Sequence, residues 1–357
     1  MWRTEVTERL GIEVPVMVSP MAGGPTTAAL VVAAGRAGAL GSVAAGYLTP
    51  GRLRDEIRAV RAGTDRPFAV NLFALGPPVP DPAAVEVVVE RIGPLRAELG
   101  LPPRPEVTAW GDDLAGQLEV VLEERPAVVS FTFGLLPEDA VDRLHAAGCL
   151  LMGTATTVAE AVALERSGSD LVCAQGAEAG AHRGTFLGPP ASGLVGTMAL
   201  VPQVCDAVDV PVVAAGGIMD GRGVVAALAL GADAAQLGTA FLRCPEAGTA
   251  AAHREALAGA DEASTAVTDR LTGRYARGVR NRLMEVMADL DVPPYPVTNA
   301  LTSELRRAAA AAGRADLMSL WAGQGVAMAT ERPAADVVAD LVAGAAAVVD
   351  RLAATRD

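Results

Sequence analysis

The sequence contains no lysine, so all 29 of its basic residues are arginines. They are outnumbered by 42 acidic residues, which gives a formal net charge of −13 at pH 7. Proteins that bind the nucleic-acid backbone present a basic stripe to it, and none is visible in this chain. We therefore expect no nucleic-acid partner. Any phosphate group of a ligand must be held by backbone N–H groups or by arginine.

Long apolar runs are also absent, although 51% of the residues are hydrophobic. The longest runs, such as 28–34 and 341–349, fall short of the roughly 20 residues that cross a bilayer. Charged residues interrupt the segment 1–16, where an exported protein would carry an apolar stretch. These features predict a cytoplasmic protein without a membrane partner.

Cysteine is scarce, with four residues, and aromatic residues make up only 3% of the chain. The cysteines, Cys149, Cys173, Cys205 and Cys244, show no C-x-x-C spacing, which favours buried free thiols over a redox centre. No histidine or cysteine pair has the spacing of zinc ligands, so we expect no metal.

Short β-branched segments alternate with alanine-rich helical segments through the first two-thirds of the chain. This pattern predicts strands at 14–19, 39–43, 68–72, 127–131, 150–153, 170–175, 211–215 and 233–237. It predicts helices at 26–36, 49–62, 137–147, 157–167, 197–207 and 222–230. Repeated strand–helix units of this length indicate an α/β fold, a TIM (β/α)8 barrel. A doubly wound Rossmann sheet is the alternative, but its G-x-G-x-x-G fingerprint is missing.

Two long gaps and the end of the strand pattern divide the chain. Residues 76–124 contain proline-rich stretches and indicate an insertion after the third strand. Residues 176–196 form a glycine-rich loop that is too long for an ordinary βα turn. We expect a barrel over 1–245, with that insertion, and a smaller, mostly helical domain over 246–357 that can pack back on the barrel.

Glycine-containing loops follow the last two expected strands, where TIM barrels often bind phosphate. The first contains Gly216 and Gly217, and the second contains Gln236, Leu237, Gly238 and Thr239. Glycine lets the backbone approach an anion closely, and a helix N-terminus offers N–H donors. Each loop alone is equally compatible with a tight turn, whereas the two together favour a phosphate site.

Two further loops carry features suited to a flat heterocycle. Small residues at 19–24, Ser-Pro-Met-Ala-Gly-Gly, would let a planar ring lie against the backbone. Asn71 interrupts an apolar strand at its catalytic end and offers both a donor and an acceptor. An ordinary core or turn asparagine remains the alternative for Asn71.

His182 is the residue that points most directly to catalysis. It lies in the glycine-rich loop after the sixth strand, within the segment CAQGAEAGAHRG at 173–184. An imidazole there suits proton transfer near neutral pH. The other two histidines, His145 and His253, lie in helical patterns, and we expect both at the surface or at helix C-termini.

Several motifs, in order, resemble one enzyme family. They are PVMVSPMAGGP, FAVNLF, SFTFG, GTATT, AQGAEAGAHRG, AAGGIMDGRG, QLGTAFL, PPYPVTNAL at 293–301 and SLWAGQG at 319–325. Together they are similar to the class I nitronate monooxygenases, once called 2-nitropropane dioxygenases. The resemblance implies an FMN-dependent oxidation of alkyl nitronates, propionate 3-nitronate above all, by O2 to a carbonyl compound and nitrite, without NAD(P)H.

The resemblance also implies roles for individual residues. His182 would be the catalytic residue on the substrate side of the flavin, and Trp321 and Gln324 would close the substrate pocket. The cofactor would contact Pro20, Met21, Ala22, Asn71, Gln175, Gly180, Gly216, Gly217, Gln236, Leu237, Gly238 and Thr239. Nearby Arg183, with Arg274, Arg277 and Arg280, could attract an anionic substrate, although solvated arginines on a helix face are the favoured interpretation.

One position departs from the family pattern, which commonly has glycine where this chain has Ala181. If that position requires a positive φ, alanine strains the loop by about 1 kcal/mol. Two other functions remain open: an NAD(P)H-dependent flavin reductase for quinones or enoyl thioesters, and a flavin- or phosphate-binding barrel without turnover. A homodimer is the expected assembly on general frequency.

Overall fold

The computed structural model describes residues 2–355 and contains a barrel of eight parallel strands. The strands run in the order β1-β9-β8-β6-β5-β4-β3-β2, and a bridge between Met17 and Leu40 joins the two edges. This confirms the predicted fold class. Each predicted strand is present: β1 (Val16–Val18), β2 (Gly41–Ala44), β3 (Phe68–Phe73), β4 (Val128–Thr132), β5 (Leu150–Ala155), β6 (Leu171–Gln175), β8 (Val212–Ala215) and β9 (Ala234–Leu237).

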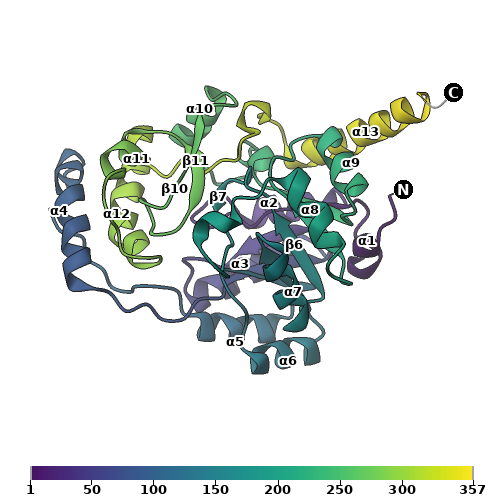
Figure 1. Cartoon of the computed structure of the whole chain (residues 1–357), viewed down its shortest axis with the longest axis horizontal. Helices are drawn as coiled ribbons and strands as arrows, with labels where there is room; N and C mark the ends of the chain where they lie inside the picture. The colour runs from purple at the N-terminus through teal and green to yellow at the C-terminus, as the bar shows by residue number, and fades with distance from the viewer. Residues whose placement is uncertain (1, 356–357) are drawn as a thin grey trace.

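Amphipathic helices surround the barrel and bury their apolar faces on it (Figure 1). Side-chain oxygens of Thr27, Thr49, Asp113, Thr157 and Asp220 cap the N-termini of α2, α3, α5, α7 and α9. The surrounding helices are α2 (Ala28–Arg36), α3 (Pro50–Gly63), α5 (Leu114–Glu124), α6 (Glu138–Ala146), α7 (Val158–Arg166), α8 (Thr197–Cys205) and α9 (Gly221–Ala229). The short α1 (Glu5–Leu10) instead packs Val6 and Leu10 against the barrel interior.

The last helix, α13 (Ala334–Ala353), returns to the barrel and packs on α9 and α2 (Figure 1). The approach to α9 is close, because a Cβ atom at Gly221 would lie 2.1 Å from the backbone nitrogen of Ala345. Only glycine at position 221 permits this contact. Helix α13 therefore packs against the barrel, although it comes from the C-terminal third of the chain.

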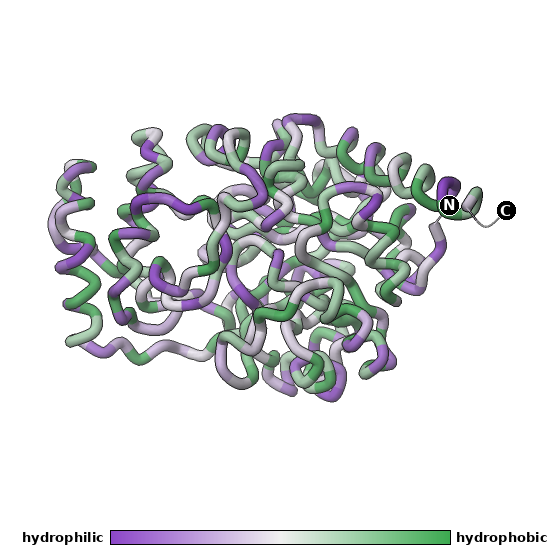
Figure 2. The backbone as a smooth tube through the Cα atoms, turned by 45° about the horizontal axis from the view of Figure 1, so that its top comes forward, coloured by the Kyte–Doolittle hydropathy of each residue, from purple (hydrophilic) through white to green (hydrophobic). Residues whose placement is uncertain are grey.

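A second group of helices has its own apolar core beside the barrel. It comprises α4 (Pro82–Glu98), α10 (Ala251–Ala258), α11 (Arg282–Met287) and α12 (Val297–Ala311). Helix α4 comes from the insertion after β3, crosses to the far side of this group and packs on α12 (Figure 1). Its buried side chains Val88, Ile92 and Leu95 recur at helical spacing, and Figure 2 shows hydrophobic and hydrophilic residues interspersed along it. We call this group the cap.

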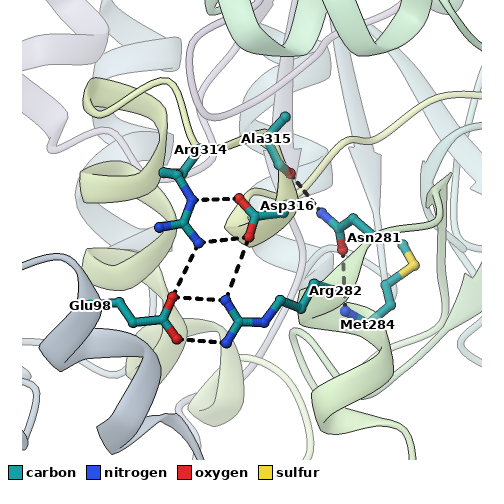
Figure 3. Close-up of polar contacts among 7 residues, drawn as sticks. All are labelled: Glu98, Asn281, Arg282, Met284, Arg314, Ala315 and Asp316. Atoms are coloured by element: carbon teal, nitrogen blue, oxygen red, sulfur yellow. Dashed lines mark hydrogen bonds and ion pairs between the residues drawn. The ribbon is translucent and has the colours of Figure 1, made fainter.

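An ionic cluster fastens the end of α4 to the rest of the cap (Figure 3). The Glu98 carboxylate accepts hydrogen bonds from Arg282 at 2.6 and 2.8 Å and from Arg314 at 3.1 Å. Asp316 pairs with the same Arg314 at 2.8 Å. The two guanidinium groups lower the pKa of Glu98 to about 2. Because the pairs are partly exposed, they orient the helix more than they stabilise it.

A small antiparallel sheet joins the barrel to the cap. The loop after β6 forms β7 (Ala181–His182), which pairs with β11 (Ala276–Val279), and β11 pairs with β10 (Thr265–Thr268). In this register His182 lies opposite Ala276. The loop predicted to carry the chemistry is therefore held by the cap. Within residues 2–355, no helix has the length and apolar character needed to cross a membrane.

Candidate functional site

A cavity of about 420 Å³ lies between the carboxyl ends of the barrel strands and the cap. Its volume is in the range of small-molecule sites. With one exception, the residues predicted for the site line it: Pro20, Met21, Ala22, Asn71, Gln175, Gly180, His182, Gly216, Gly217, Gln236, Leu237, Gly238, Thr239 and Trp321.

The exception is Gln324, whose side chain is exposed and does not line the cavity. Its backbone N–H donates to the carbonyl oxygen of Glu178 at 2.9 Å, which turns the residue outward. The segment nevertheless reaches the site, because Trp321, Gly323 and Gly325 line the cavity. The motif segment therefore contributes to the cavity through residues other than Gln324.

The imidazole of His182 is enclosed by aromatic rings. Its centroid lies 5.1 Å from that of Tyr295, 5.7 Å from that of Trp321 and 5.8 Å from that of Phe133. Burial, together with the charges of Arg274 and Arg306, lowers the pKa of His182 to about 3. The ring is therefore neutral at neutral pH and keeps an unprotonated nitrogen that can accept a proton.

Gln175 positions the loop that carries His182. Its Nε2 donates to the carbonyl oxygen of His182 at 3.0 Å, and its Oε1 accepts from the N–H of Gly184 at 2.8 Å. The Gln175 side-chain amide thus forms hydrogen bonds with the backbone of the residues before and after Arg183. The Arg183 guanidinium is itself buried and donates to the carbonyl oxygens of Gly176 and Gly193 at 2.6 and 2.8 Å.

The loops after β8 and β9 form a glycine-rich floor. Gly216 and Gly217 have φ values of 113° and 72°, a region that favours glycine. The carbonyl oxygen of Gly216 accepts from the Thr197 hydroxyl at 2.9 Å. In the neighbouring loop, the Thr239 hydroxyl accepts from the N–H of Gly323 at 2.9 Å and so ties the floor to the cap.

Comparison with known proteins identifies the family. The family model for nitronate monooxygenase matches residues 3–344. A nitronate monooxygenase of Pseudomonas aeruginosa is 46% identical over 94% of this chain and 97% of its own. The structure of a nitroalkane oxidase from Streptomyces ansochromogenes is 42% identical, covers 97% of this chain and 99% of its own, and superposes with a TM-score of 0.90.

The chain belongs to the nitronate monooxygenase family. It is therefore an oxidoreductase, in agreement with the resemblance seen in the sequence motifs. The barrel and cap also resemble FabK from Thermotoga maritima, at 29% identity with a TM-score of 0.80, over 99% of this chain and all of the other. The fold is thus shared beyond nitronate monooxygenases.

Strained backbone gathers at this site. The residues other than glycine with positive φ include Tyr47 at 70°, Phe133 at 81° and Ala181 at 60°, and all three line the cavity. Such strain persists only where the surrounding structure maintains it. Ala181, at the position where the nitronate monooxygenase pattern has glycine, therefore does adopt the positive φ considered from the sequence.

A half-buried arginine at the cavity was missed by the sequence analysis. Arg306, on α12, lines the cavity and donates to the side-chain oxygens of Asn299 at 2.6 Å and Ser319 at 2.9 Å. No carboxylate within residues 2–355 lies within ion-pair distance of it. Burial lowers its pKa from the ordinary value. A partly buried cation without a counterion favours an anionic ligand.

The arginines singled out in the sequence have different positions. Arg183 and Arg277 are buried and hold backbone carbonyl oxygens, and the Arg274 guanidinium lies 4.1 Å from the ring centroid of Phe133. None of these three is a solvated helix residue, so that expectation was wrong for them, while Arg280 is exposed. They contribute positive charge near the cavity without lining it.

His253 was expected at the surface, and this was wrong. It is buried on α10 and lines the cavity. Its pKa is lowered to about 4 by burial. Its Nε2 finds no hydrogen-bond partner within the described residues, and the same is true of Gln236 Oε1. The helical pattern of 251–258 does not show this position, because it does not indicate which face of α10 points to the cavity.

These features fit a flavin nucleotide. A buried acceptor without a donor costs about 1–3 kcal/mol, and Gln236 Oε1 could accept from the ring or the ribityl chain of such a ligand. The glycine floor leaves room for a phosphate, as the loops after the last two strands of a barrel often do. No group of three histidine, cysteine or acidic residues suited to a metal occurs among residues 2–355.

Proposed function

We propose that the protein binds FMN and oxidises propionate 3-nitronate and related alkyl nitronates with O2, giving a carbonyl compound and nitrite. The observation that carries this proposal is that His182 shares one cavity with the guanidinium of Arg306, which has no carboxylate partner in the described part of the chain. A neutral base and a fixed positive charge suit a substrate with two anionic groups. Propionate 3-nitronate has a nitronate at one end and a carboxylate at the other.

The residues that would hold FMN follow from their places in the cavity. Gly216, Gly217, Gly238 and Thr239 would surround the phosphate, and Gln236 would accept from the ring or the ribityl chain. Pro20, Met21, Ala22, Asn71 and Gly180 would lie along the ring system. When bound, FMN supplies the electron-accepting ring that the oxidation of a nitronate by O2 requires.

Arg306 would bind the carboxylate of the substrate and so orient its nitronate end. A charge-assisted hydrogen bond from a guanidinium is among the stronger polar contacts in proteins. The positive charge of Arg306 lies inside the cavity and so attracts a dianion locally, although the net charge of the whole protein is −13. The aromatic rings of Phe133, Tyr295 and Trp321 would exclude water from the reacting carbon.

His182 would act as a base when a neutral nitroalkane enters. Its unprotonated nitrogen would take the proton from the carbon next to the nitro group, and the electron pair of that C–H bond would move onto the nitro oxygens. The nitronate formed beside it would favour the imidazolium and raise a pKa that is about 3 in the free cavity. A substrate that arrives as a nitronate would bypass this step.

An anaerobic titration of the flavin-loaded protein tests the proposal. Propionate 3-nitronate is added while the visible absorption of the flavin is recorded, and NADH is added to a parallel sample. We expect the nitronate to change the flavin spectrum and NADH to leave it unaltered. Bleaching by NADH alone would support a flavin reductase. No change with either would support a barrel that binds without turnover.

A further inference from the structure

Thr272 lies next to the catalytic base, although it is 90 residues away in the sequence. It belongs to the connection between β10 and β11 and is fully buried. Its hydroxyl oxygen lies 2.9 Å from Nε2 of His182 and 3.2 Å from the carbonyl oxygen of Arg274. The residue therefore bridges the imidazole and the cap backbone.

The directions of these two hydrogen bonds follow from counting protons. A hydroxyl has one proton, and a carbonyl oxygen can only accept. The Arg274 carbonyl oxygen receives no other hydrogen bond from the described residues, and the Thr272 hydroxyl donates to it. With its one proton used in this way, the Thr272 oxygen is left to accept from Nε2–H of His182. Because the imidazole is neutral, its other nitrogen, Nδ1, then has no proton.

The connection that carries Thr272 is held firmly, so this arrangement persists. The carbonyl oxygen of Leu271 accepts from the Thr302 hydroxyl at 2.8 Å, and that of Gly273 accepts from the N–H of Tyr295 at 2.9 Å. A Cβ atom at Gly273 would lie 2.3 Å from the carbonyl oxygen of Pro293. Residues on both sides of Thr272 are thus fastened to α12 and the segment before it.

We infer that Thr272 is a positioning residue that fixes His182 in the Nε2–H tautomer and makes Nδ1 its basic nitrogen. The inference builds on the proposed function only in treating His182 as a base. It has a consequence for the substrate. A His182 side chain held in this way has no N–H left to donate to the nitro oxygens. Donors to those oxygens must come from other groups of the cavity.

The tautomer can be measured directly because the chain has only three histidines. We would label histidine with ¹⁵N in the flavin-loaded protein and record the coupling of both ring nitrogens to the ring carbon-bound protons. A spectrum of His182→Asn assigns the signals. We expect His182 as the Nε2–H form. A wild-type protein with His182 as the Nδ1–H form would overturn the inference, even where nitronate turnover is normal.

Two variants separate the hydroxyl from the shape of the side chain. Thr272→Ser keeps the hydroxyl, and we expect an unchanged tautomer. Thr272→Val keeps the shape without the hydroxyl, and we expect a measurable population of the Nδ1–H form. Flavin absorption and thermal unfolding show whether each variant is folded. A folded Thr272→Val protein that keeps the wild-type tautomer would also contradict the inference. The tautomer decides the inference, whereas turnover measurements test the proposed function.

Discussion

Gly180 and Ala322 approach each other so closely that a Cβ atom at position 180 would lie 2.5 Å from the carbonyl carbon of Ala322. The same atom would lie 2.6 Å from the backbone nitrogen of Gly323. The loop after β6 that carries His182 and the segment after Trp321 therefore meet backbone to backbone. Neither segment can move away without opening the cavity between barrel and cap.

Gly180→Ala tests this contact. The added methyl group would push against backbone atoms that cannot turn aside, so we expect a loss of about 1–3 kcal/mol in the free energy of unfolding. The holoprotein should also release flavin more readily. Urea unfolding and the flavin absorption of the purified variant measure both effects. Gly51→Ala is the control, since a Cβ atom there meets nothing within 4 Å; equal stability of the two variants would refute the contact.

Ala181→Gly should stabilise the protein. Alanine at φ 60° is strained by about 1–2 kcal/mol, which exceeds the entropic cost of about 0.5–1 kcal/mol for introducing glycine. We expect a net gain of up to about 1 kcal/mol in urea unfolding. Ala177→Gly, in the same loop without a positive φ, should lower the stability. A loss of similar size in both variants would show that Ala181 is not strained.

Arg306→Gln should discriminate between substrates. Removing the guanidinium takes away the partner of the carboxylate, so KM for propionate 3-nitronate should rise by about 10- to 100-fold. KM for propyl 1-nitronate, which has no carboxylate, should change far less. Arg280→Gln provides the control, because Arg280 is exposed and does not line the cavity. Equal changes in KM for the two substrates would show that Arg306 does not bind the substrate carboxylate.

The cluster around Glu98 should contribute a pH-dependent part of the stability. The pKa of Glu98 is lowered from 4.5 to about 2 in the folded protein, so its contribution is present above pH 4.5 and is lost as the pH falls toward 2. We expect Glu98→Gln to be less stable than the wild type at pH 6 and to approach it near pH 3. Glu90→Gln, on the exposed side of α4, should show no such convergence.

The sequence predicted the barrel well because strands buried on both faces are continuous apolar runs with little ambiguity. All eight strands were found within about two residues of their observed ends. It could not predict that α4 packs on α12, since an amphipathic pattern shows that a face is buried and not against what. The helices predicted at 137–147 and 157–167 were also correct, because their patterns, like those of the strands, are local to the sequence.

The sequence motifs identified the cavity-lining residues that lie at strand ends. They did not identify the cavity-lining residues that helices supply. His182 and the glycine loops are carried by the barrel, whose topology brings them together. Arg306 and His253 reach the cavity from α12 and α10, and their spacing in the sequence contains no trace of that contact. The Gln324 side chain lies outside the cavity for a different reason. Its direction depends on a turn that the motif does not specify.

The crossing of α4 to α12 also bears on how the chain folds during synthesis. Helix α4 ends at Glu98 and α12 begins at Val297, roughly 200 residues later. At about 5–20 residues per second, α4 leaves the ribosome some 10–40 s before its partner exists. During that interval the apolar side chains of Val88, Ile92 and Leu95 have nothing to pack against. Until α12 is synthesised, the apolar face of α4 therefore stays exposed to solvent on the insertion.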